Sequence, residues 1–233
     1  VLESMAAALL APTPSSLGAA VRMLGGAGHV DLAFAAVLQA QRFGGGATIT
    51  ADTLIALIET CIRNMRLAAV SEPLQHLQSL AEPVEASALV TLIELALDEH
   101  AVALRVYGLM KARRAVAPLR AFRALITACV AAADIDSAEA VLAEMHYAGM
   151  EPDALVAGAV LTAAAARKES AETCLVRLLP QLLAFVDDRP SMLQQLASAC
   201  EQHGLHEQAN SVLEFAQTLP SSRVIDDQQH HSH

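Results

Sequence analysis

The chain has 233 residues, of which 54% are hydrophobic, and it carries a formal net charge of −10. This hydrophobic content excludes an intrinsically disordered chain and is sufficient for a large buried core. The negative charge counts against broad nucleic-acid binding, which depends on Lys and Arg neutralising phosphates, but it is compatible with a local basic patch. The apolar residues are mainly Ala, Leu and Val, with no Trp, which is typical of close-packed helices.

A repeat of about 35 residues organises most of the chain. Each unit opens with an apolar residue, and these opening residues recur at intervals of 33 to 37: Leu17, Leu54, Leu89, Phe122, Ala157 and Leu193. Seven residues further on stand Leu24, Cys61, Ala96, Cys129, Ala164 and Cys200. The joints between units contain Pro14, Pro83, Pro118, Pro152, Pro190 and Pro220. Proline at a joint ends one helix without breaking the next.

Each unit contains two helical patterns. In the fourth unit, the stretch 122–130 places apolar residues at i, i+3, i+4, i+7 and i+8, which is one face of a helix. Asp134 or Asp136 can cap a second helix, and Gly149 can end it. A helical hairpin of this size cannot bury its apolar face alone, so neighbouring hairpins must stack. The sequence therefore predicts an all-α fold, an α-solenoid of about six helical hairpins with first helices on one wall and second helices on the other.

We expect the solenoid to span residues 14–220. Residues 1–13 are interpreted as the remnant of a preceding helix, and the polar residues 221–233 as a disordered tail. The chain begins with Val and has no basic start, so we expect the true N-terminus to lie upstream and no targeting signal to be readable. No apolar stretch reaches the roughly 20 residues that span a bilayer, which predicts no membrane insertion.

The cysteines predict a reduced protein. Four cysteines without short paired spacings do not form a disulfide scaffold. Three of them, Cys61, Cys129 and Cys200, occupy the same position of the repeat. We expect these three side chains to be buried on equivalent faces of first helices, reduced and without a metal.

Residues 118–153 read PLRAFRALITACVAAADIDSAEAVLAEMHYAGMEPD. The aromatic opening at Phe122, the buried Ala138, the Glu144-Met145 pair and the ending over 149–153 resemble a pentatricopeptide repeat. The preceding unit and the final unit share parts of this pattern. The tetratricopeptide repeat is the near alternative, but its Trp-containing signature is absent.

The resemblance implies a function in RNA binding, in the gene expression of a mitochondrion or plastid. Proteins of this kind bind single-stranded RNA along the concave wall, one nucleotide per repeat. Two positions read each base, the residue after the opening one and the last residue of the unit. Only Gln194 suits the first position and only Asp153 matches the second well. The remaining first positions hold Gly18, Ile55, Val90, Arg123 and Gly158. Gly, Ile and Val offer no side-chain hydrogen bond to a base edge, so we expect RNA to be contacted mainly through its backbone.

One stretch of the acidic chain is strongly basic. Residues 105–123 contain no acid and six cations, namely Arg105, Lys111, Arg113, Arg114, Arg120 and Arg123. Such segregation predicts a surface that holds phosphates or an acidic partner, and the alternative is a solvated ridge. Arg120 and Arg123 are expected in the first turn of a first helix, on the wall that the resemblance assigns to RNA.

Catalysis is not predicted. The sequence lacks a P-loop, a dinucleotide-binding glycine motif and a nucleophile elbow. Cys200, His203 and His206 have a metal-like spacing but no evident fourth ligand, which favours a packed thiol over a zinc site. Glu144 is expected to be solvated on an outer helix, and Asp187 and Asp188 to form a turn. We therefore expect no enzyme activity, no catalytic residue, no metal and no cofactor.

Two functions are consistent with these observations. The first is RNA binding in organellar gene expression, in RNA processing, stability or translation. The alternative is a protein–protein scaffold subunit of a larger assembly, such as an organellar ribosome or an RNA-processing complex. The partners are accordingly single-stranded RNA or the protein subunits of a ribonucleoprotein complex, with no small-molecule substrate.

Overall fold

The computed structural model describes residues 13–44, 49–166, 189–202, 204 and 206–218. These residues form eleven α-helices and one 3-10 helix, with no strand among them. The predicted all-α helical-repeat fold is confirmed. The chain divides into two compact units, Val1–Ala148 and Gly149–His233, and the boundary falls inside the range 14–220 expected for the solenoid. Each unit is described by itself.

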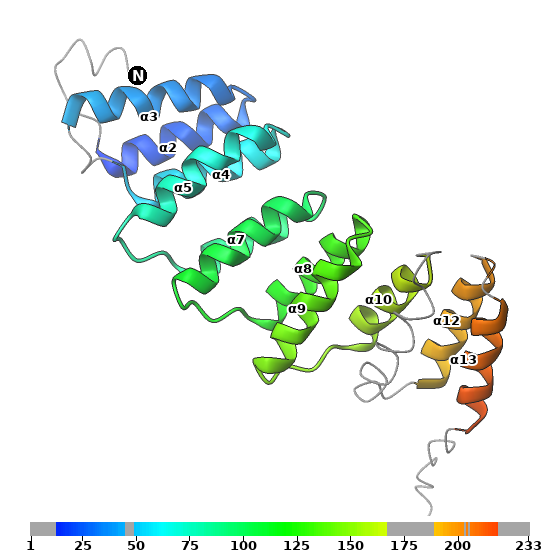
Figure 1. Ribbon diagram of the computed structural model, residues 1–233. Helices are drawn as coiled ribbons and strands as arrows, with labels where there is room; N and C mark the ends of the chain where they lie inside the picture. Colours follow the sequence, from blue (N-terminus) through cyan, green and yellow to red (C-terminus); the bar gives the residue numbers. More distant parts are fainter. Residues whose placement is uncertain (1–12, 45–48, 167–188, 203, 205, 219–233) are drawn as a thin grey trace, which may run out of the picture. The chain divides into compact units, whose positions relative to one another are not determined.

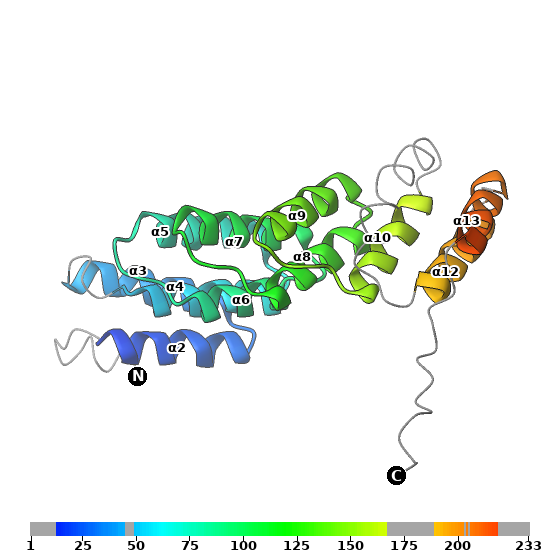
Figure 2. The same cartoon turned by 90° about the horizontal axis from the view of Figure 1, so that it is seen from below.

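The described residues of the N-terminal unit form four helical hairpins, whose arrangement can be followed in Figure 1. Its helices are α2 (Pro14–Gly26), α3 (Val30–Gly44), α4 (Ala51–Arg63), η2 (Leu67–Val70), α5 (Ser71–Ser79), α6 (Ala86–Leu95), α7 (His100–Ala112), α8 (Leu119–Ala131) and α9 (Ile135–Tyr147). Each first helix packs against the next, α2 on α4, α4 on α6 and α6 on α8. Figure 2 shows the second helices α5, α7 and α9 as a separate row above α4, α6 and α8. The predicted division into two walls is therefore present in the second, third and fourth hairpins of this unit.

The C-terminal unit contains α10 (Ala154–Ala166), α12 (Arg189–Gln202) and α13 (His206–Thr218). Helix α12 packs against both α10 and α13, which makes α12 and α13 the last hairpin. The expected partner helix of α10 falls in residues 167–188, outside the described residues. The expected N-terminal remnant and polar tail also lie outside them, except for Thr13.

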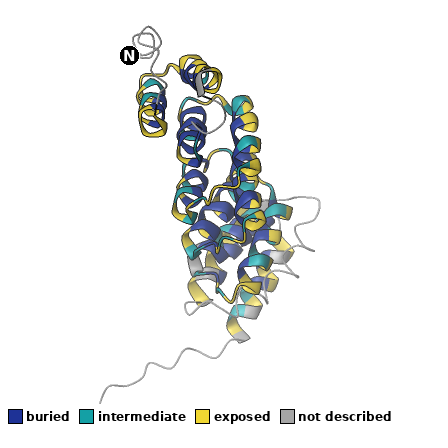
Figure 3. Cartoon of the chain, turned by 90° about the vertical axis from the view of Figure 1, so that its left-hand side faces the viewer, coloured by how far each residue is buried: buried dark blue, intermediate teal, exposed yellow. Residues whose placement is uncertain are grey.

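The repeat register is confirmed by burial. All six opening residues, from Leu17 to Leu193, are no more than 2% exposed. Cys61, Cys129 and Cys200 are each fully buried in the same slot. In Figure 3 the buried residues gather where helices face one another, and exposed residues cover the outside. Stacking of hairpins thus buries the apolar stripe that a single hairpin would leave in water.

Local signals define the helix ends. Asp134 is the N-cap of α9 and accepts a hydrogen bond from the Ser137 backbone N–H at 3.1 Å, which decides between the two predicted caps. Gly149 follows α9 with φ of 73°, a conformation that favours glycine. The same left-handed conformation is adopted by Met65, Arg114 and Ala133 after α4, α7 and α8.

Three of the predicted joint prolines, Pro83, Pro118 and Pro152, lie between hairpins. Pro14 and Pro190 are instead the first and second residues of α2 and α12, in the first turn where a missing N–H is tolerated, and Pro220 lies outside the described residues. Pro73 lies near the start of α5, just after the 3-10 helix η2. The second helix of this hairpin is therefore split, a feature that the repeat pattern does not predict.

Helices α2 and α4 approach closely at a glycine. A Cβ atom built on Gly25 would lie 2.8 Å from both Cβ and Cγ2 of Thr60, closer than side chains tolerate. The neighbouring Gly26 has nothing within 4 Å of the same position. Thr60 and Thr53, both on α4, are the buried polar residues of the described core. Gly25 therefore permits a helix contact that any larger residue would block.

Candidate nucleic-acid interface

The six cations of the basic stretch lie on three different elements of the N-terminal unit. Arg105 and Lys111 belong to α7 in the second-helix row, and Arg113 and Arg114 follow α7 in the joint. Arg120 and Arg123 belong to α8 in the first-helix row. The stretch is therefore divided between the two walls, and its members have different environments.

Arg113 connects two hairpins. One of its Nη atoms donates to the Glu82 carbonyl at 2.6 Å, and the other donates to the Leu77 and Leu80 carbonyls at 2.5 and 2.7 Å. These carbonyls belong to the end of α5 and the segment after it, where backbone acceptors lack helical partners. The Arg113 Nε is buried without a hydrogen-bond partner in the described structure. The donors of this guanidinium are thus directed into the fold.

Glu82 extends this connection to a third element. Its carboxylate accepts a hydrogen bond from the Ala51 backbone N–H at 2.9 Å, at the start of α4. A carboxylate at this position also complements the positive end of the helix dipole. Arg113 and Glu82 together hold the joint between α5 and α6 against two helices.

Lys111 takes part in a network between α7 and α9. Its Nζ donates to Glu144 Oε1 at 2.7 Å and lies 4.9 Å from the centre of the Tyr107 ring. The Tyr107 hydroxyl donates to Glu144 Oε2 at 2.6 Å. The prediction of a merely solvated Glu144 is wrong, because this carboxylate binds two side chains of the neighbouring hairpin.

The network changes the acidity of both acidic groups. Partial burial alone would raise the Glu144 pKa, but the hydrogen bonds from Lys111 and Tyr107 outweigh it, so the pKa is lowered. Burial raises the pKa of Tyr107 well above its ordinary value, and the contact with Glu144 raises it further. Tyr107 also packs edge-to-face on Phe122 of α8, with ring centres 5.8 Å apart. The network is therefore a structural contact between three helices.

Arg120 and Arg123 are the two cations of the basic stretch that lie on the first-helix row, and both are exposed. Arg120 Nε lies 3.7 Å from Glu94 Oε1 of α6, and the Arg120 side chain is 58% exposed. Arg123 follows one helical turn later and is also exposed, as are Thr127 on α8 and Ser87 and Thr91 on α6. The two arginines and the Thr127 hydroxyl provide hydrogen-bond donors suited to phosphate oxygens. The Ser87 hydroxyl donates to Glu85 Oε2 and the Thr91 hydroxyl to the Ser87 carbonyl, each at 3.1 Å.

The positions expected to read bases differ from one hairpin to the next. Ile55 and Val90 are 7% and 1% exposed, so neither can reach a ligand without unpacking. Arg123 and Gln194 are exposed, on α8 and α12. Asp153 Oδ1 accepts from the Val156 backbone N–H at 2.9 Å and so caps α10. Asp153 and Gln194 belong to the C-terminal unit, whereas the basic stretch belongs to the N-terminal unit.

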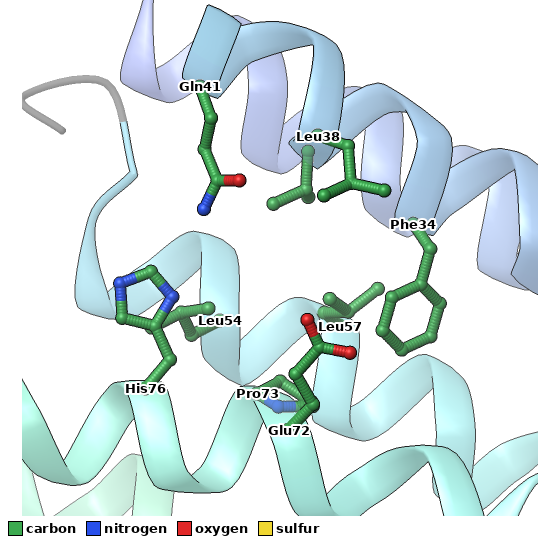
Figure 4. Close-up of a pocket in the computed structure, with 9 residues that line it drawn as sticks. Phe34, Leu38, Gln41, Leu54, Leu57, Glu72, Pro73 and His76 are labelled. Carbon is green, nitrogen blue, oxygen red and sulfur yellow. The ribbon is translucent and has the colours of Figure 1, made fainter. Parts of the chain in front are cut away.

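A small hollow lies between the first two hairpins. Figure 4 shows Phe34 and Leu38 of α3 facing Leu54 and Leu57 of α4, with Glu72 and His76 projecting from α5 at the rim. Its lining also includes Gln41 of α3, and none of the lining residues is a lysine or an arginine. We assign it no role in nucleic-acid binding.

The described residues contain no helix that is both long and apolar enough to cross a membrane. They also contain no cluster of three potential metal ligands, while His203, Asp187 and Asp188 lie outside them. Burial raises the pKa of the Cys61 and Cys129 thiols to about 11, which disfavours the reactive thiolate. These thiols pack in the core, as predicted.

Known proteins resemble this chain in fold. No family model and no curated protein sequence matches it. Among solved structures, the pentatricopeptide repeat protein PPR10 from maize matches with a TM-score of 0.53 and 18% sequence identity, over 88% of this chain. The chain spans 30% of the length of that protein. The chain therefore has the helical-repeat fold of a pentatricopeptide repeat protein.

Proposed function

We propose that this protein binds single-stranded RNA through the first-helix row of its N-terminal unit, in the gene expression of a mitochondrion or plastid. The observation that carries the proposal is the exposed pair Arg120 and Arg123, one turn apart on α8. The exposed Thr127 hydroxyl stands one turn further along the same helix. Binding is proposed without a catalytic step.

The proposed interaction is with the sugar–phosphate backbone. Ile55 and Val90 are buried where base-reading residues are expected, so hairpins two and three offer no side chain for a base edge. Arg113 and Lys111 are engaged within the fold, which leaves a smaller cationic surface than the sequence alone predicts. We therefore expect modest affinity, little sequence preference and a marked dependence on salt.

Fluorescence anisotropy with labelled single-stranded RNAs of different sequence tests this function. In the double variant Arg120→Ala/Arg123→Ala, affinity should fall roughly tenfold at low salt for every sequence, and the salt slope should decrease by about 1.4. The matched control is Arg42→Ala/Arg105→Ala, which removes two positive charges from second helices. Equal binding by the wild type and the double variant, or no binding by the wild type at low salt, would refute the proposal.

The second candidate is a protein scaffold. Two observations favour it. Ile55 and Val90 are buried where base-reading residues are expected, and apolar side chains are exposed elsewhere, among them Tyr147 at 96% and Val116 at 78% exposure. Scaffold function predicts stable association with protein subunits that survives nuclease treatment. Co-purification before and after nuclease distinguishes the two functions.

A further inference from the structure

An open groove runs between α5 and α7 in the second-helix row. It has a volume of about 480 Å³, and its lining includes Leu74, Gln75 and Gln78 of α5 and Arg105, Gly108 and Leu109 of α7. This volume lies within the range of sites that bind small ligands or peptide segments. The groove does not include Arg120 or Arg123, so a ligand could bind here whether or not α8 binds RNA.

No contact or backbone conformation within the described chain explains why position 108 is a glycine. It lies in the interior of α7, where glycine is less favourable than alanine. A Cβ atom at this position would meet nothing within 4 Å, and the backbone is not left-handed. Unlike Gly25, Gly108 therefore permits no close contact with another helix, and its effect is to keep the groove open.

Arg105 contributes an uncompensated positive charge beside the groove. Its Nη1 donates to the neutral Ser71 hydroxyl at 2.9 Å, and no carboxylate of the described residues pairs with it. Lys111, by contrast, pairs with Glu144 at 2.7 Å. Gln75 and Gln78 are exposed and make no hydrogen bond within the described part of the chain. Each amide offers both donors and an acceptor.

We propose that this groove binds an extended acidic segment of a partner protein. A carboxylate of the segment pairs with Arg105, and its peptide groups hydrogen-bond to the amides of Gln75 and Gln78. The backbone of the segment passes close to Gly108. One cation and two amides suit a peptide better than a polyanion, which requires successive cations along its phosphates.

Selection from a short-peptide display library with a fixed central Asp tests the proposal on the full chain. Replacing that Asp with Asn should weaken binding at least about fivefold, because the charge-assisted hydrogen bond is lost. Arg105→Glu and Gly108→Leu should each weaken binding at least about tenfold. Arg22→Glu, the same charge change on α2, should have little effect.

Circular dichroism of each variant separates loss of binding from loss of folding, and Gly108→Leu is expected to fold because its Cβ has room. The proposal is overturned if no acidic peptide is selected, or if selected peptides bind Arg105→Glu and Gly108→Leu as tightly as the wild type. It is also overturned if Arg105→Glu abolishes RNA binding and single-stranded RNA displaces the peptides, because the groove would then belong to the RNA site.

Discussion

The two sides of α7 differ in what they contact. On the side of α9, Tyr107 and Lys111 bind Glu144. Arg113, just after the helix, donates instead to carbonyls of α5 and the segment after it. On the other side Arg105 and Gly108 face an open groove. The basic stretch in the sequence does not distinguish these sides, because charge alone does not show whether a cation is used inside the fold. The contacts with neighbouring helices decide it. Replacing a residue that is bound within the fold and replacing Gly108, which contacts nothing, should therefore have opposite consequences for stability.

The largest effect is expected at Arg113. Arg113→Ala removes hydrogen bonds to three carbonyls and should lower the free energy of unfolding by roughly 3 kcal/mol. Urea denaturation followed by circular dichroism measures the change. Arg113→Lys should recover only part of the loss, because an ammonium cannot reproduce the planar fork. A loss as small as that of Arg114→Ala would show that the joint does not need the guanidinium.

Tyr107 tests the contact between α7 and α9. Tyr107→Phe keeps the ring against Phe122 but removes the 2.6 Å hydrogen bond to Glu144, and should cost about 1 kcal/mol of stability. Tyr147→Phe is the control, because Tyr147 is 96% exposed. Equal unfolding midpoints for the two variants would contradict this role of the hydroxyl.

The exposed side of α7 should respond in the opposite direction. Gly108→Ala should stabilise the protein by about 0.5–1 kcal/mol, because alanine is favoured in helices and the added methyl meets no atom. Gly25→Ala should destabilise it by about 1–3 kcal/mol, because its methyl collides with Thr60. Thermal unfolding measures both. If Gly108→Ala also destabilised the chain, Gly108 would have a structural role and would no longer point to a ligand in the groove.

The smallest expected effect is the pH dependence of the Glu144 network. The Glu144 pKa is lower in the folded state, so the carboxylate stabilises the fold above its ordinary pKa of 4.5 and the contribution is lost as the pH falls through the folded value. Because the side chain is 40% exposed, the effect should be well below about 1 kcal/mol. The stability difference between the wild type and Glu144→Gln should shrink in acid. If the stability difference between the wild type and Glu144→Gln stayed constant from neutral to acidic pH, this pH dependence would be contradicted.

The hairpin architecture could be predicted from the sequence because apolar and small residues recur at the same positions of each repeat. Cys61, Cys129 and Cys200 occupy the same position of the repeat and so define the register of the first helices, and each side chain is fully buried. Asp134 and Gly149 mark helix ends through local chemistry that needs no tertiary information.

Contacts between hairpins could not be predicted in the same way. Arg113 reaches carbonyls 31 to 36 residues away, and nothing in the spacing shows which cation of the stretch does so. The binding of Glu144 by Tyr107 and Lys111 likewise depends on how α7 lies against α9. The groove beside Gly108 could not be predicted from the sequence. A single glycine in a helical pattern can mark a close helix contact, as at Gly25, or an open surface, and only the structure shows that the space around Gly108 is empty.

The contact between Gly25 and Thr60 limits how the hairpins could be exchanged. Repeat proteins are often treated as interchangeable modules, yet the position equivalent to Gly25 holds Ile62, Leu97 and Val130 in the next three hairpins. Placing any of these hairpins before the second one would drive a branched side chain into Thr60. The first hairpin is therefore specific to its place, and a gene duplication or a designed shuffling of this array would have to carry the glycine and the threonine as a pair.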